Sequence, residues 1–84
     1  MGELSRLPNI GEIIEVQLKR VGINTIEELR VVGSKNAWSR IKEIDDTSCI
    51  HKLYALEGAI QGIKKNELSI DKKDELKNFC NSFK

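Results

Sequence analysis

The sequence predicts an all-α fold, a compact bundle of five or six short helices. Apolar residues recur at three- and four-residue spacing in successive segments, and no segment shows the strict apolar/polar alternation of a half-buried strand. The 84 residues include only six glycines and one proline, which is few for a loop-rich chain. With 39% apolar residues, this length favours one domain over residues 1–84 with a small core.

The first two helices are predicted on either side of Pro8. Since a residue before proline is pushed out of the helical region, a first helix of one or two turns ends near Leu7. A second helix follows Gly11 and ends at Gly22. Its apolar stripe holds Ile10, Ile13, Ile14, Leu18 and Val21. Its polar positions hold Glu12, Glu15, Lys19 and Arg20.

Two further helices are predicted up to residue 47. Thr25 and Glu28 have the spacing of a capping box, so a short helix begins at Thr25 and ends at Gly33. Ser34 is a candidate cap for the next helix, whose stripe contains Ala37 or Trp38, Ile41 and Ile44. The run of residues 45–47, Asp-Asp-Thr, favours a turn that ends this helix.

A central helix is predicted from Ser48, its cap, to Ile63. Its apolar residues have heptad-like spacing and lie beside a stripe of small residues; they are Cys49, Leu53, Leu56, Ile60 and Ile63. Gly58 inside a helix costs roughly 1 kcal/mol relative to Ala, which predicts that a second helix approaches closely there. The small residues are Ala55, Gly58, Ala59 and Gly62.

A last helix, capped by Ser69 or Asp71, places Leu76, Phe79, Cys80 and Phe83 on the core. The predicted core as a whole consists of large apolar residues drawn from all the longer helices. It comprises Ile14, Leu18, Leu29, Trp38, Ile41, Leu53, Leu56, Ile60 and Phe79.

Charge and residue types exclude several classes of protein. The formal net charge is +1, so any anion must be bound locally and not by an overall basic surface. Cys49 and Cys80 have no further Cys or His at ligand spacing, so we expect no metal and interpret both as small buried apolar groups. His51 has no partners at a spacing that defines a triad, so we expect no enzyme and no cofactor. The absence of a long apolar run and of a secretion signal predicts a cytoplasmic protein with no membrane contact.

The segment from Leu7 to Leu29 resembles a helix-hairpin-helix motif, whose tight turn presents backbone amides to a nucleic-acid phosphate. The resemblance places Ile10 at the centre of the turn and Gly11 at its end, with Asn9 where a first glycine is expected. Glu12 puts a carboxylate beside the amides and opposes an anion. The candidate nucleic-acid contacts are Asn9, Ile10, Gly11, Lys19 and Arg20.

The segment from Gly22 to Leu29 is similar to part of the carboxy-terminal domain of the bacterial RNA polymerase α subunit. We interpret it as a packing device in which Gly22 ends one helix, Ile23 fills the core and Thr25 starts the next helix. Four residues are predicted to have structural roles: Gly22, Gly58, Gly62 and Trp38.

Two separated blocks in the same order, residues 7–29 and the Leu-Tyr-Ala-Leu-Glu-Gly-Ala-Ile-Gln-Gly run of residues 53–62, resemble the carboxy-terminal domain of the TfoX/Sxy family. The resemblance implies a bacterial regulator of natural competence and DNA-uptake genes, in which this domain follows an amino-terminal domain.

Two functions follow as alternatives. The first is a protein-interaction module that contacts a protein of the transcription or competence machinery, with a homodimer left open. The second is weak DNA binding through the Asn9–Gly11 turn and a basic patch, with Trp38 and Tyr54 as a stacking pair. Core packing for both aromatic residues, and an ordinary solvated face for the basic residues, are the simpler interpretations. The patch would contain Lys19, Arg20, Arg30, Lys35, Arg40 and Lys42.

Overall fold

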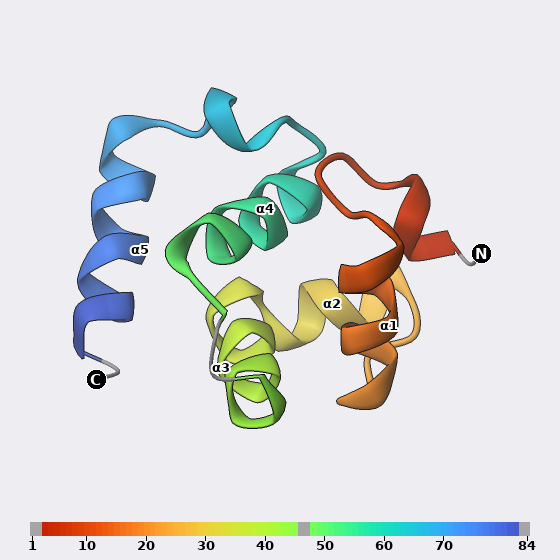
Figure 1. Ribbon diagram of the computed structural model, residues 1–84. Coiled ribbons are helices and arrows are strands. Elements are labelled where there is room, and N and C mark those ends of the chain that lie inside the picture. The colour runs from red at the N-terminus through yellow and green to blue at the C-terminus, as the bar shows by residue number, and fades with distance from the viewer. Residues whose placement is uncertain (1–2, 46–47, 83–84) are drawn as a thin grey trace.

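The computed structural model describes residues 3–45 and 48–82, and every regular element in these two ranges is a helix (Figure 1). This confirms the all-α prediction. In chain order the elements are the 3₁₀ helix η1 (Glu3–Arg6), α1 (Glu12–Arg20), α2 (Ile26–Val32), α3 (Ser34–Ile44), α4 (Ile50–Gln61), the 3₁₀ helix η2 (Lys65–Glu67) and α5 (Ile70–Ser82).

Helix α4 lies at the centre of the molecule. It contacts α2, α3, η2 and α5, whereas α1 packs against η1 and α3 (Figure 1). Leu53 and Leu56 of α4 have no exposed surface, and Ile60 packs partly buried against the core. The central position of this helix is therefore confirmed. Its bounds were predicted wrongly, because it runs from Ile50 to Gln61 and not from Ser48 to Ile63, and Gly62 ends the helix and does not lie within it.

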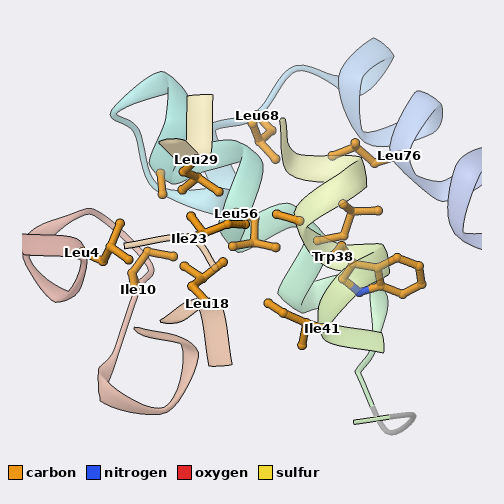
Figure 2. Close-up of a cluster of buried hydrophobic side chains, with 13 residues drawn as sticks. Leu4, Ile10, Leu18, Ile23, Leu29, Trp38, Ile41, Leu56, Leu68 and Leu76 are labelled. Atoms are coloured by element: carbon orange, nitrogen blue, oxygen red, sulfur yellow. The ribbon is translucent and has the colours of Figure 1, made fainter. Parts of the chain in front are cut away.

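The core consists of apolar side chains from all the α-helices α1 to α5 and from the loops between them (Figure 2). Six of the nine predicted core residues are fully buried, and Ile14, Ile60 and Phe79 pack against them partly buried. Leu4 and Leu68 join the core from η1 and from the loop after η2, where no helical periodicity predicts burial. The six are Leu18, Leu29, Trp38, Ile41, Leu53 and Leu56.

Glycines end α1 and α4 in the same way. After α1, Ile23 N donates to Leu18 O at 2.9 Å and Gly22 N donates to Lys19 O at 3.1 Å. After α4, Ile63 N donates to Gly58 O at 2.9 Å. This is the Schellman arrangement, which needs a left-handed residue, and the two glycines have φ of +87° and +77°. It also turns Ile23 into the core, where it is fully buried.

The helix starts agree only in part with the predicted caps. Thr25 Oγ1 accepts from Glu28 N at 3.1 Å, and Ser69 Oγ accepts from Lys72 N at 3.1 Å, so these two residues cap α2 and α5. Ser34 is not a cap: it is the first residue of α3, and its hydroxyl donates to Glu57 Oε1 of α4 at 2.6 Å. Ser48 is not a cap either, because Cys49 precedes α4.

Four predicted exposures are wrong, and the first is that of Ile44, which was assigned to the apolar stripe of α3 but is 44% exposed. Ile13 is 75% exposed and Glu15 is buried, because Ile14, Glu15 and Leu18 face the core while Ile13 lies about 140° around α1 from Leu18. Cys49 is exposed and Cys80 is half-buried, so only Cys80 contributes to packing. Phe83 and residues 46–47 of the predicted turn lie outside the described residues.

Candidate interaction sites

The amino-terminal turn has the backbone of a tight hairpin without its first glycine. Asn9 adopts φ +69°, the left-handed region that asparagine tolerates better than most residues. Ile10 is buried in the core, and Gly11 is exposed in an extended conformation directly before α1. The turn therefore leads directly into α1, and the buried side chain of Ile10 packs it against the core.

The side chain of Asn9 fastens this turn to the far end of α4. Asn9 Nδ2 donates to Ile63 O at 3.0 Å, and Asn9 Oδ1 accepts from Lys65 N at 3.0 Å. Both polar groups of the amide are thus engaged with a segment 54 to 56 residues away. They are used to join two parts of the fold.

Gly58 lies under this contact. A Cβ at Gly58 would stand 2.6 Å from Asn9 Nδ2, 2.8 Å from Ile63 O and 3.3 Å from Lys65 N. The expectation that a second helix approaches Gly58 is wrong, because the close neighbours are an asparagine side chain and the backbone that follows α4 itself. Gly62, in contrast, has open space around it and is required for its positive φ.

The electrostatics of the turn oppose a phosphate. The first turn of α1 carries two carboxylates, the exposed Glu12 and the buried Glu15, next to the amides that would have to hold an anion. Negative charge at a helix amino terminus satisfies the local dipole and competes with any bound anion.

The structure does not bring the candidate nucleic-acid contacts together. Lys19 and Arg20 are exposed in the last turn of α1, whereas Asn9, Ile10 and Gly11 precede its first turn. At 1.5 Å per residue, Gly11 and Lys19 lie ~12 Å apart along the helix axis. Helix α1 therefore separates the hairpin turn from the two basic residues.

The other members of the predicted basic patch have separate partners. Lys35 forms an ion pair with Glu75 at 2.6 Å and lies 5.8 Å from the centre of the Phe79 ring. Arg40 Nη1 donates to Val21 O at 3.4 Å. Lys42 lies over Trp38 and donates to Ser48 O at 3.2 Å. Three of the six cations therefore contact three different parts of the chain: α5, the loop after α1 and the loop before α4. Arg30 is exposed on α2.

The Lys35–Glu75 pair belongs to a small cluster that joins α3 to α5. Lys72 also contacts Glu75, at 3.2 Å, from within α5. Hydrogen bonds from the Lys35 and Lys72 ammonium groups, with their charges, hold the pKa of the Glu75 carboxyl below its ordinary value. The carboxylate therefore stays ionised to lower pH than a free glutamate.

Trp38 and Tyr54 do not form a stacking pair. Trp38 is buried, donates through Nε1 to Cys49 O at 3.1 Å, and meets Phe79 edge to face at 6.1 Å. Tyr54 instead meets His51 edge to face, with ring centres 6.2 Å apart. The burial of Trp38 agrees with a role in core packing. Tyr54 is half-buried beside the exposed His51.

Helix α1 carries an apolar surface that the sequence did not single out. Ile13 is 75% exposed and Val16 is 54% exposed, and they line a shallow groove of about 430 Å³. We call this the α1 apolar groove; it is lined by Glu12, Ile13, Val16, Gln17 and Arg20. The available signal was that α1 has more apolar residues than one buried stripe needs.

Fold and turn geometry together define a class: small all-helical domains in which short helices surround a central helix, and a tight turn with a left-handed residue precedes the first α-helix. The model of the TfoX C-terminal domain family matches residues 1–80, and the chain belongs to this family. It is 34% identical over 79 residues to the protein Sxy of Escherichia coli strain K12, covering 94% of this chain and 38% of Sxy.

Two solved structures from Listeria monocytogenes have the same fold. An uncharacterized protein in a triclinic crystal form is 52% identical, with a TM-score of 0.94 over 95% of this chain and 91% of the other. A tetragonal form of a protein of unknown function is 51% identical, with a TM-score of 0.92 over 95% and 99% of the two chains.

The described residues contain neither a cluster of metal ligands nor a membrane-spanning helix. Within residues 3–45 and 48–82, no three His, Cys, Asp or Glu side chains lie together as metal ligands. None of the helices in these ranges has the length and apolar content needed to cross a membrane.

Proposed function

We propose that this domain is a non-enzymatic protein-interaction module of a TfoX/Sxy-type regulator of competence genes. Its partner is a protein of the transcription or competence machinery, held at the α1 apolar groove. The observation that carries the proposal is the exposure of Ile13 and Val16, one helical turn apart on α1.

The groove has the composition of a small protein contact. Exposed apolar side chains surrounded by polar ones mark interaction surfaces, and covering an isoleucine contributes ~1.5 to 3 kcal/mol. Glu12 and Arg20 lie at opposite ends of the groove residues and carry opposite charges. A partner helix with an apolar stripe and one residue of each charge would complement this arrangement.

Duplex DNA at the amino-terminal turn is the less favoured function. The amide of Asn9 is engaged with Ile63 and Lys65, and Glu12 stands where a phosphate would approach. The net charge of +1 offers no long-range attraction to compensate.

The test replaces Ile13 with lysine and uses Ile70→Lys as its matched control. Ile70 is 77% exposed on α5 and outside the groove, so the two variants make the same change at the same exposure. In a bacterial host, each variant domain replaces the corresponding domain of the resident TfoX/Sxy-type regulator. Transcription from a competence-gene promoter is then measured. We expect Ile13→Lys to lose activation and Ile70→Lys to retain it.

Two outcomes would overturn this function. Equal activation by both variants would remove the groove from the mechanism. Loss of activation only in Lys19→Gln with Arg20→Gln, accompanied by loss of duplex affinity at low salt, would assign the function to DNA contacts instead. Sedimentation velocity of the parent and of Ile13→Lys separates a second copy from a different partner, because a dimer held by this groove dissociates in the variant.

A further inference from the structure

A second groove lies on the other half of the molecule, where three elements meet. Its residues come from α4, from η2 and from α5, which Figure 1 draws in green to teal, in light blue and in blue. The groove has a volume of about 210 Å³. We call it the α4–α5 groove; it is lined by His51, Tyr54, Lys65, Asn66 and Lys73.

The charge of this groove is positive. Its lining contains two lysines and no carboxylate. Among the residues that the structure describes, Lys35, Lys52 and Lys72 have carboxylate partners within 4 Å, whereas Lys65 and Lys73 do not. Two ammonium groups that no protein carboxylate neutralises are available to an anion from outside.

The aromatic part is ordered by its own contacts. Tyr54 packs against the core on one side and meets His51 at an interplanar angle of 81° on the other. His51 is exposed and Tyr54 is half-buried, so ring surface borders the same groove as the lysines. Aromatic surface beside ammonium groups is the combination that binds the bases and phosphates of single-stranded nucleic acid.

The backbone beneath the groove is fixed by the amino-terminal turn. Asn9 Oδ1 accepts from the amide of Lys65, and Lys64 N donates to Glu67 Oε1 at 2.9 Å, which closes η2 on itself. Asn9, which stands where the helix-hairpin-helix motif has its first glycine, thereby positions the backbone of Lys65. A preorganised site loses less conformational entropy when a ligand binds.

We propose that the α4–α5 groove binds a nucleotide unit, with the phosphate at Lys65 and Lys73, the base against His51 and Tyr54, and the Asn66 amide available to the sugar or base edge. The unit is either one nucleotide of a single strand or a free mononucleotide. Both present the same phosphate ester and the same aromatic base.

The test uses a labelled oligothymidylate and thymidine monophosphate at low salt. Binding of the oligonucleotide is followed by fluorescence anisotropy, and the ring proton resonances of His51 and Tyr54 are followed by NMR with both probes. The groove variant is Lys65→Gln with Lys73→Gln. The matched control is Arg30→Gln with Lys77→Gln, which removes the same charge from exposed positions on α2 and α5 outside both grooves.

We expect the groove variant to weaken binding and to reduce the slope of log affinity against log salt by about 0.7, since the two lysines hold one phosphate and each single-strand phosphate contact contributes about 0.7. The control pair should keep most of the parent slope. His51→Ala changes an exposed residue and keeps both lysines. It should weaken binding of the oligonucleotide about fivefold or more, because the stacking contact is lost. Circular dichroism and the thermal midpoint establish that each variant is folded.

The NMR arm distinguishes the two sources. Ring shifts with thymidine monophosphate would identify a free nucleotide as sufficient, and shifts with the oligonucleotide alone would identify a strand. Ring resonances that move with neither probe would overturn the proposal, as would a control pair that reduces affinity as much as the groove pair.

Discussion

Asn9 performs two tasks that are usually divided between residues. Its backbone takes the left-handed conformation of the turn, and its side chain holds the segment between α4 and η2 through two hydrogen bonds of 3.0 Å. Glycine would perform the first task alone, and alanine neither. The turn thereby becomes a tertiary contact, and Gly58 is the position that leaves room for it.

The two tasks of Asn9 can be measured separately. Asn9→Gly keeps the permitted φ and removes both hydrogen bonds, so we expect a loss of about 1 to 3 kcal/mol in the free energy of unfolding. Asn9→Ala adds backbone strain and should cost about 1 kcal/mol more. Urea unfolding of the three proteins provides the comparison. Equal stability of Asn9→Gly and the parent would show that the amide bonds contribute nothing.

Gly58→Ala should destabilise the protein although alanine is the better helix former. The new Cβ would meet Asn9 Nδ2 at 2.6 Å, and we expect overpacking of ~1 to 3 kcal/mol to exceed the ~1 kcal/mol gained in helix propensity. In an Asn9→Gly background one of the close neighbours is gone, so the same change should cost less. A raised thermal midpoint for Gly58→Ala alone would reject the close approach, and strict additivity would exclude Asn9 as the neighbour.

At the scale of elements, α5 is held to the rest of the fold by few contacts. Leu76 is its fully buried residue, Phe79 meets Trp38 edge to face, and Glu75 pairs with Lys35 of α3. The remaining face is largely exposed, including Ile70. The attachment of α5 therefore depends more on charge than that of α4.

The Lys35–Glu75 contact makes the stability of α5 depend on pH. The pKa of Glu75 is lowered from 4.5 in the folded protein, chiefly by hydrogen bonds from Lys35 and Lys72. Its stabilisation is therefore present well above pH 4.5 and is lost as the pH falls through the lowered pKa. The thermal midpoint of the parent should exceed that of Glu75→Gln near neutral pH, and the gap should close in acid.

Salt provides the control for that prediction. Because the side chains of the pair are 38% and 46% exposed, 1 M salt with a Debye length of about 3 Å should also reduce the gap. A difference between the parent and Glu75→Gln that is the same at all pH values would indicate lost packing in place of lost charge.

At the scale of the whole molecule, one core of leucine, isoleucine and tryptophan side chains joins all five α-helices (Figure 2). Helix α1 contributes Leu18 to that core and presents Ile13 to solvent from its opposite side. The same helix thus serves the fold with one face and the proposed partner with the other.

The two faces of α1 should respond differently to truncation. Leu18→Ala removes a fully buried side chain and should cost ~2 to 5 kcal/mol in the free energy of unfolding. Ile13→Ala removes exposed methyl groups and should change stability by less than about 0.5 kcal/mol. Urea unfolding followed by Trp38 fluorescence measures both. Comparable losses would mean that Ile13 is buried in solution, either within the monomer or by a second copy.

The amino-acid sequence by itself determined the helices and how they end. Gly22 and Gly33 follow the ends of α1 and α2 with positive φ, and Thr25 with Glu28 begins α2. These features depend on residues within about five positions of one another, so a local pattern is sufficient to predict them. The central position of the helix that carries Leu53 and Leu56 followed from the same periodicity.

The tertiary structure alone decided which side of each helix is covered and what each turn contacts. In the folded protein Glu15 is buried, whereas Ile13 and Cys49 are exposed. Trp38 lies apart from Tyr54, and Asn9 contacts a loop that is more than 50 residues away in the sequence. The physical reason is that a helix with apolar residues on two sides has no unique orientation until its neighbours are in place. Both proposed grooves lie on surfaces defined by that packing.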